Sequence, residues 1–182
     1  MKPIYSMIVA TTIDGKIATN KRQFTDWTSK EDKDFLHKLL DKSDVIVVGH
    51  NTYKTAKGPL SKRNCIVMTR SVSGAVKKNS KLVFINPKKE NLEKFIKKAK
   101  YKRVAVLGGA QTYTYFLENN LLNEIYLTIE PLVFGKGFGM FETKKVLRKY
   151  FKLVSVKKLN KKESLVLHYS AREGLKKETL RV

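Results

Sequence analysis

Short apolar runs, separated by polar segments, set the pattern of this chain. Residues 4–10 and 44–49 are rich in apolar and β-branched side chains, which is typical of strands buried on both faces of a sheet. The segment that starts at Thr28 has capping-box spacing and then apolar residues at helical spacing. Further strands are predicted over 65–69, 81–85, 103–107 and 123–129, and further helices over 90–100 and 111–117.

Strand and helix alternate along the chain, and a final antiparallel strand pair is predicted over 149–157 and 163–169. This order predicts an α/β fold with a mostly parallel central sheet and helices on both of its faces. Residues 11–27 have no helical period and are interpreted as a long loop. The length of 182 residues suits one domain, and the chain contains no internal repeat.

Candidate ligand-binding segments follow several predicted strands. In such sheets ligands bind beyond the carboxyl ends of the strands. The segments expected there are the 11–27 loop, 49–55, Thr69-Arg70 and 108–112. Polar or glycine-rich strand ends favour an extended ligand that carries phosphate, such as a dinucleotide. Neither a G-x-G-x-x-G motif nor a Walker A motif is present, so the sequence does not support a standard Rossmann or P-loop site.

The formal charge of +22 raises the possibility of a nucleic-acid partner. The basic residues are mostly lysines in scattered pairs, without a known DNA- or RNA-binding motif, so we expect a solvated surface and no specific nucleic acid. The alternative is a field that concentrates anionic ligands. One cysteine excludes an intramolecular disulfide framework or a cysteine-cluster metal site. No apolar run is long enough for a membrane span, and a cytoplasmic protein is expected.

Five segments, in order, resemble the dihydrofolate reductase superfamily, which includes the reductases of riboflavin biosynthesis. They are Trp27 followed by Asp32, GHNTY at 49–53, GPLSKRN at 58–64, LGGAQTY at 107–113 and LNEIYLT at 122–128. The resemblance spans about residues 4–170. It implies a dihydrofolate-reductase-like domain over 1–170 and a C-terminal extension over 171–182.

The resemblance implies that NADPH binds along the strand ends and passes a hydride to a pterin. Asp32 would bind the amidine-like edge of the pterin, and Trp27 would order a water molecule beside it. Substrate contacts are expected from Ile8, Leu36, Ala56, Leu60, Thr128 and Arg63, with Arg63 pairing a carboxylate on the substrate tail. Cofactor contacts are expected from Ala10, Ile17, Gly49, His50, Asn51, Thr52, Thr69, Arg70, Leu107, Gly108, Gly109, Ala110, Gln111, Thr112 and Tyr113, with a cis peptide between the two glycines and no metal.

The main expectation is therefore NADPH-dependent reduction of 7,8-dihydrofolate by a monomer or homodimer. Taken alone, Asp32 is equally typical of a capping box. Residues 12–18, TIDGKIA, resemble the riboflavin-pathway reductases more closely, whereas 52–59 lack the D-D-P-x-L-type insert of those enzymes.

Lys33 alters the expected pterin pocket, which predicts weak inhibition by diaminopyrimidine antifolates. The alternatives are a riboflavin-pathway reductase acting on a diamino-ribosylamino-pyrimidinone phosphate and a non-enzymatic nucleic-acid-binding protein.

Overall fold

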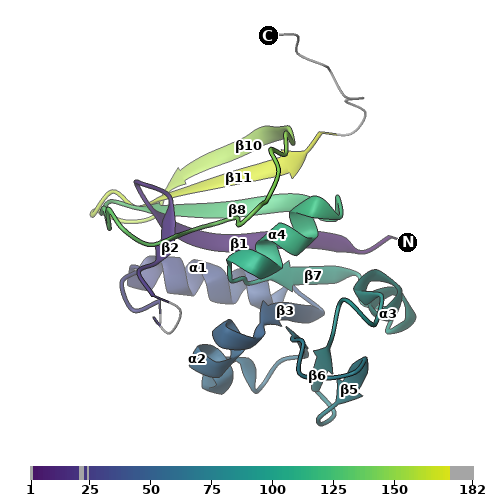
Figure 1. Cartoon of the computed structure of the whole chain (residues 1–182). Helices are drawn as coiled ribbons and strands as arrows, with labels where there is room; N and C mark the ends of the chain where they lie inside the picture. Colours follow the sequence, from purple (N-terminus) through teal and green to yellow (C-terminus); the bar gives the residue numbers. More distant parts are fainter. Residues whose placement is uncertain (1, 21–22, 24, 173–182) are drawn as a thin grey trace, which may run out of the picture.

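The computed structural model describes residues 2–20, 23 and 25–172. A nine-stranded sheet forms the centre of the described part, in the order β10-β11-β8-β1-β7-β3-β4-β6-β5 (Figure 1). Strands β8, β1, β7, β3, β4 and β6 run parallel to one another, and β5, β11 and β10 pair antiparallel. The strands are β1 (Ile4–Thr12), β3 (Val45–Gly49), β4 (Cys65–Met68), β5 (Ala75–Lys77), β6 (Leu82–Ile85), β7 (Arg103–Val106), β8 (Leu122–Glu130), β10 (Phe151–Lys158) and β11 (Leu165–Ala171), with β2 (Lys16–Ala18) and β9 (Phe138–Gly139) as a separate pair.

Four helices cover the two faces of this sheet: α1 (Lys30–Asp41), α2 (His50–Leu60), α3 (Leu92–Lys98) and α4 (Ala110–Glu118). Strand β3 shows why both faces are covered, because all of its first four residues are apolar and buried. Val45 and Val47 pack in the apolar cluster that includes α3 and α4, whereas Ile46 and Val48 pack in the cluster that includes α1 and α2. Alternate side chains of a strand point to opposite faces, so a continuous apolar run needs a helix layer on each side.

The predicted fold class is confirmed, and the boundaries of several elements differ from the prediction. Helix α1 begins at Lys30, with Ser29 as its N-cap, and its cap oxygen accepts a hydrogen bond from the backbone N–H of Asp32 at 3.2 Å. Helix α2 was not expected as a helix; it contains Pro59, and the backbone of Ala56 departs from helical geometry. The predicted C-terminal extension, apart from its first two residues, lies outside the described residues.

No helix in the described part of the chain is long and apolar enough to cross a membrane. Nor do the described residues contain a cluster of histidine, cysteine, aspartate and glutamate that could hold a metal ion.

Candidate functional site

The backbone at the carboxyl ends of β3 and β7 is packed too tightly for side chains. The backbone N–H of Gly49 donates to the carbonyl oxygen of Gly108 at 2.7 Å, and the Gly108–Gly109 peptide is cis. Gly108 has a φ of +89°, and a Cβ there would lie 2.7 Å from the ring of Tyr113. A Cβ on Gly49 would lie 2.9 Å from the hydroxyl oxygen of Thr112. Glycine at these two positions is therefore required by close approach, and by a positive φ at Gly108.

Tyr113 anchors α4 to the first strand behind this glycine pair. Its hydroxyl donates a hydrogen bond to the carbonyl oxygen of Ile8 at 2.8 Å, and the ring is buried. Gly109 is the N-cap of α4 and has no side chain with which to cap the first turn. The first backbone N–H groups of α4 therefore open on the carboxyl edge of the sheet, where they favour a negatively charged ligand.

The polar residues that follow β3 and β4 lie next to this edge, because Gly49 and Met68 are register partners. His50 opens α2 with its ring 6.0 Å from that of Phe84, and its Nδ1 is buried without a hydrogen-bond partner among the described residues. Thr69 is buried, and its hydroxyl shares a 3.0 Å hydrogen bond with that of Ser71. Arg70 is exposed. The strand ends predicted to hold the cofactor are thus neighbours in space. The buried Nδ1 of His50 lies among them without a hydrogen-bond partner among the described residues.

Asp32 lies in the first turn of α1 and is buried, with 8% of its surface exposed. Burial raises the pKa of its carboxyl above the ordinary value, and the negative charge of Glu130 acts in the same direction. Hydrogen bonds with the side chains of Thr128 and Thr28, and the charge of Lys33, lower that pKa and only partly offset burial. Such a carboxyl keeps its proton to a higher pH than an exposed aspartate, as an acid catalyst must.

The first strand and β8 bring other predicted residues to the same region. Ala10 of β1 is the register partner of Thr128 of β8, so both belong to the strand pair beneath the start of α1. Ile17 lies in β2 and packs against the opposite cluster, the one that includes α3 and α4. Trp27 packs edge-on against Phe134 at 5.2 Å, and its indole N–H is buried without a partner among the described residues. A water or a ligand atom would satisfy that donor.

The predicted apolar substrate contacts gather on one face, but Arg63 lies away from Asp32. Ile8, Leu36, Ala56 and Leu60 all belong to the cluster between α1, α2 and the sheet. Arg63, by contrast, forms a 2.6 Å ion pair with Asp41 at the last residue of α1, whereas Asp32 is in the first turn. The substrate contact predicted for Arg63 would therefore involve the far end of α1.

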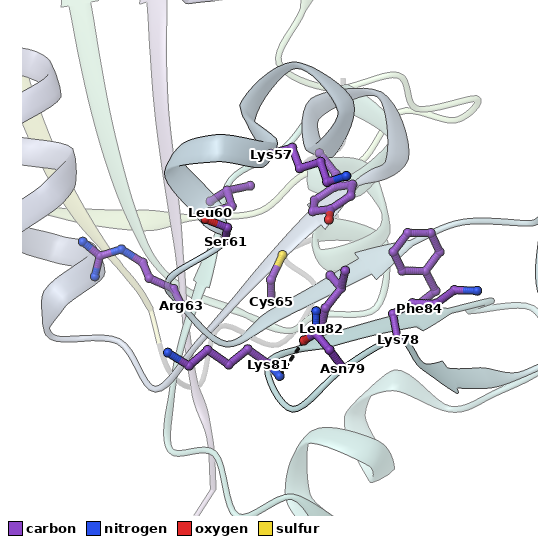
Figure 2. Close-up of a pocket in the computed structure, with 11 residues that line it drawn as sticks. Lys57, Leu60, Ser61, Arg63, Cys65, Lys78, Asn79, Lys81, Leu82 and Phe84 are labelled. Atoms are coloured by element: carbon purple, nitrogen blue, oxygen red, sulfur yellow. Dashed lines mark hydrogen bonds between the residues drawn. The ribbon is translucent and has the colours of Figure 1, made fainter.

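A pocket of about 330 Å³ lies at the amino ends of β4 and β6, at the other end of the sheet from the glycine pair (Figure 2). Its floor contains Cys65 and Leu60, both buried, and its rim carries Lys57, Lys78 and Lys81. The side chain of Arg63 also lines it, but the guanidinium points away from Cys65 in Figure 2. Of the residues predicted to bind ligands, only Leu60 and Arg63 line this pocket, so it is separate from the site around Asp32.

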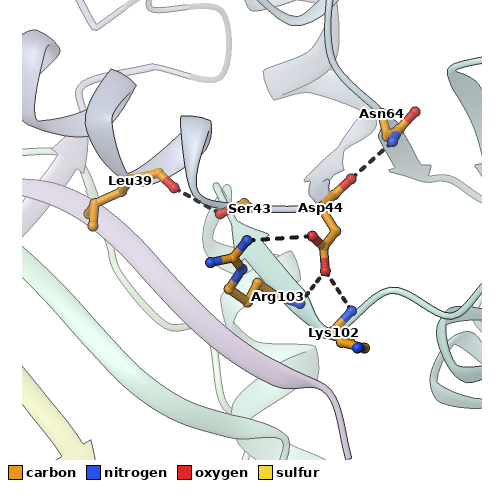
Figure 3. A network of polar contacts seen from close by, with 6 residues as sticks. All are labelled: Leu39, Ser43, Asp44, Asn64, Lys102 and Arg103. Atoms are coloured by element: carbon orange, nitrogen blue, oxygen red, sulfur yellow. Dashed lines mark hydrogen bonds and ion pairs between the residues drawn. The ribbon is translucent and has the colours of Figure 1, made fainter.

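The amino ends of β3 and β7 are closed by a polar network (Figure 3). The carboxylate of Asp44 accepts hydrogen bonds from the backbone N–H groups of Lys102 and Arg103 at 2.7 and 2.8 Å. The side-chain amide of Asn64 donates to the carbonyl oxygen of Asp44 at 3.0 Å. Both oxygens of the Asp44 carboxylate have partners within the protein, since Arg103 also forms a 3.9 Å ion pair with it, which indicates a structural role.

Glu130 is the residue of this site that the sequence reasoning missed. It ends β8, and only 3% of its surface is exposed. Its carboxylate accepts hydrogen bonds from the backbone N–H and the hydroxyl of Ser29, both at 2.8 Å. A charged residue at the end of a strand normally indicates a solvated position, so the sequence carried no signal for this contact across 101 residues.

The model of the RibD C-terminal domain family matches residues 5–165, most of the chain. The protein belongs to this family. Among solved structures, Acinetobacter baumannii RibD superposes with a TM-score of 0.78 at 16% identity, over 94% of this chain and 59% of the other. A bifunctional deaminase/reductase from Thermotoga maritima superposes with a TM-score of 0.70 at 19% identity, over 94% of this chain and 57% of the other. The chain thus spans less than two thirds of these RibD proteins, and the likeness shows the shared fold.

Two curated proteins are similar in sequence. The uncharacterized protein YwjB of Bacillus subtilis (strain 168) is 24% identical over 143 residues, which is 74% of this chain and 80% of YwjB. The bifunctional dihydrofolate reductase-thymidylate synthase of Plasmodium vinckei is 30% identical over 95 residues, which is 49% of this chain and 52% of the other protein. These relatives agree with membership of the dihydrofolate reductase superfamily.

The expectation of dihydrofolate reduction is wrong, because the family match lies with the riboflavin-biosynthesis branch. The predicted roles in tetrahydrofolate synthesis and in antifolate resistance are wrong with it. The features that favoured the folate enzymes were Pro59-Leu60 and Arg63 in the segment 58–64 and the missing insert in 52–59. The sequence alternative, a riboflavin-pathway reductase, is the interpretation that the comparisons support.

Proposed function

We propose that this protein is an NADPH-dependent reductase of the riboflavin branch that acts on a phosphoribosylamino-pyrimidine. Membership of the RibD C-terminal domain family supports it, as does the name of the Thermotoga relative, which includes 5-amino-6-(5-phosphoribosylamino)uracil reductase. The observation that carries the proposal is the buried carboxyl of Asp32, whose pKa is raised by burial, at the open edge of the sheet.

The residues at this edge fit a dinucleotide. The glycines at 49 and 108 let the ends of β3 and β7 pack closely against Thr112 and Tyr113 of α4, and the uncapped start of α4 favours a pyrophosphate. The buried, unpaired Nδ1 of His50 and the exposed guanidinium of Arg70 would hold the ribose-phosphate side. NADPH, when bound, supplies the hydride.

Asp32 would donate the proton that this reduction needs. Hydride addition at the anomeric carbon of a ribosylamine breaks the bond from that carbon to the ring oxygen, and the freed oxygen must take up a proton. A carboxyl donates a proton only while it holds one, so the rate should fall as the pH rises through the pKa of Asp32. Burial moves that fall to a higher pH than for an exposed aspartate.

We assign no substrate contact to Arg63, because its guanidinium pairs with Asp41 at the last residue of α1, whereas Asp32 lies in the first turn of that helix. The buried acidic groups at the start of α1 are Asp32 and Glu130.

The direct test follows the loss of NADPH absorbance at 340 nm with the phosphoribosylamino-pyrimidinone substrate. Asp32→Asn should lower kcat by about 10²- to 10⁴-fold, the usual contribution of a positioned acid. Asp34→Asn removes the same charge from an exposed position of α1 and should leave the rate unchanged. Equal rates for Asp32→Asn and wild type would remove Asp32 from the mechanism. Absence of turnover by the wild-type protein would reject the function itself.

A further inference from the structure

Glu130 presents a buried carboxylate whose described contacts are all hydrogen-bond donors. Besides the two groups of Ser29, the hydroxyl of Ser164 donates to its Oε2 at 2.5 Å. Ser164 is fully buried, with no exposed surface. No ion pair of Glu130 with a lysine, arginine or histidine occurs among the described residues, within 4.0 Å. Hydrogen bonds from the two serines, and not an ion pair, therefore hold this side chain inside the protein.

Three segments that are distant in the sequence meet at this carboxylate. Ser29 belongs to the N-cap of α1, Glu130 ends β8, and Ser164 precedes β11. Asn160 holds Ser164 from the same turn, because its side-chain oxygen accepts from the backbone N–H of Ser164 at 3.2 Å. The side-chain amide of Asn160 also donates to Glu31 of α1 at 3.3 Å. Hydrogen bonds thereby connect the start of α1 both to β8 and to the turn between β10 and β11.

Ser29 connects Glu130 to Asp32 through its hydroxyl group. The hydroxyl oxygen of Ser29 accepts the backbone N–H of Asp32 at 3.2 Å while its hydrogen is donated to Glu130 at 2.8 Å. Glu130 also interacts with the carboxyl of Asp32 directly through its charge. Glu130 therefore acts on Asp32 in two ways: through the position of Ser29 and, as a smaller addition to burial, through its negative charge.

We propose that Glu130 is a positioning residue, which through Ser29 places Asp32 at the sheet edge as the proton donor. The inference rests on the proposed function only for which reaction Asp32 serves. Its structural part concerns the protonation of Asp32 in the free protein, which can be measured without substrate. A residue that merely stabilised the fold would act on the position of α1 but not on the proton of Asp32.

The groups that face Asp32 fix the sign of the effect. From α1, the charge of Lys33 lowers its pKa; from β8 and from the N-cap turn, the hydrogen bonds of Thr128 and Thr28 lower it. Tyr113 of α4 is neutral, because burial raises the pKa of its phenol and Asp32 adds to that shift. The described neighbour of Asp32 with a like charge is Glu130. Removing that charge should therefore lower the pKa of Asp32.

The decisive variant is Glu130→Gln, because glutamine has the same shape and its oxygen can still accept from Ser29. The alkaline fall of kcat should move to lower pH, and the titration of the Asp32 carboxyl, followed by ¹³C NMR in the free protein, should move in the same direction. Two controls accompany it. Glu118→Gln removes an exposed carboxylate at the end of α4, and Ser164→Ala removes one donor but keeps the charge of Glu130. Both controls should leave the titration of Asp32 in place.

Each outcome decides one proposal. An unchanged Asp32 titration in Glu130→Gln would overturn the role of Glu130 even if the enzyme were active. A shifted titration in a protein without turnover would support Glu130 and reject the proposed reaction. If Glu130→Gln does not fold, Glu130→Met takes its place, because it also removes the charge and adds no polar group that would need a partner. An unchanged titration of Asp32 in Glu130→Met would then reject the proposal.

Discussion

The two ends of the central sheet differ in how they use polar groups. At the carboxyl ends, around Gly49, Gly108 and Asp32, the backbone is closely packed and the polar side chains are buried. At the amino ends, the pocket over Cys65 has an apolar floor and lysines on its rim. The charges at the amino ends are exposed lysines, whereas the carboxyl ends hold Asp32, whose pKa is raised by burial.

The comparison shows that desolvation, more than the number of charges, creates reactive groups. A lysine on an exposed rim is screened by water and salt, so it interacts weakly with its neighbours. The carboxyl of Asp32 is shielded from water, so burial alone is enough to raise its pKa. The net charge of +22 therefore describes the surface and says little about the site.

The largest expected effect is a slow alkylation of Cys65, which lies in the floor of the lysine-rimmed pocket. Burial raises the pKa of the Cys65 thiol to about 12. At pH 8 its thiolate fraction is then about a thousandfold below that of a free cysteine, and alkylation should be slower by at least that factor. Iodoacetamide labelling followed by mass spectrometry measures the rate. Ser80→Cys in a Cys65→Ala background provides an exposed thiol nearby, and equal rates for the two would show that Cys65 is accessible.

At the other end of the sheet, Gly108→Ala should destabilise the protein by about 3 kcal/mol. The new methyl group would meet the ring of Tyr113 at 2.7 Å, and a φ of +89° disfavours any residue with a Cβ. Urea unfolding measures the loss. Gly58→Ala is the control, because a Cβ at Gly58 has nothing within 4 Å and the residue lies in α2. A loss of similar size in both variants would contradict the tight packing assigned to the carboxyl edge.

Ser29→Ala should cost about 1 kcal/mol of stability, the usual effect of losing an N-cap. It should also lower the rate of reduction, because the same hydroxyl donates to Glu130. Asn91→Ala removes the equivalent cap of α3, where the side-chain oxygen accepts from the backbone N–H of Lys94 at 2.8 Å. That variant should lose comparable stability with no loss of kcat. Equal losses of kcat would mean that helix capping alone explains the effect of Ser29.

The smallest effect is expected at the pocket rim. The ammonium of Lys81 donates to the carbonyl oxygen of Lys62 at 3.1 Å in an exposed position. Lys81→Gln should change the free energy of unfolding by less than about 0.5 kcal/mol and should not change kcat. Thermal unfolding and the 340 nm assay check both. A clear loss of activity would show that this end of the sheet takes part in the reaction.

Much of the fold could be predicted because the signals are local. The apolar run of β3 indicated burial on both faces, and the spacing from Ser29 to Asp32 indicated the start of α1. Helix α2 was missed because Gly58 and Pro59 are poor helix formers, and only its packing against β3 and β4 holds the kinked segment in place. The choice of substrate was wrong because it relied on Arg63 and its neighbours, and the fold places Arg63 on Asp41 at the far end of α1 from Asp32.

The sequence by itself determined most strands, three helices, the glycine pair and the acid at the start of α1, since each depends on residues close together in the chain. The short strands β2, β5 and β9 were not predicted, and β2 lies within the segment 11–27 that was interpreted as a loop. The tertiary structure decided which of these segments became neighbours. Only the order β11-β8-β1 and the packing of α1 across it bring Ser29, Glu130 and Ser164 together. Burial and like-charge interaction arise from those distant contacts, so the raised pKa of Asp32 is a property of the folded sheet.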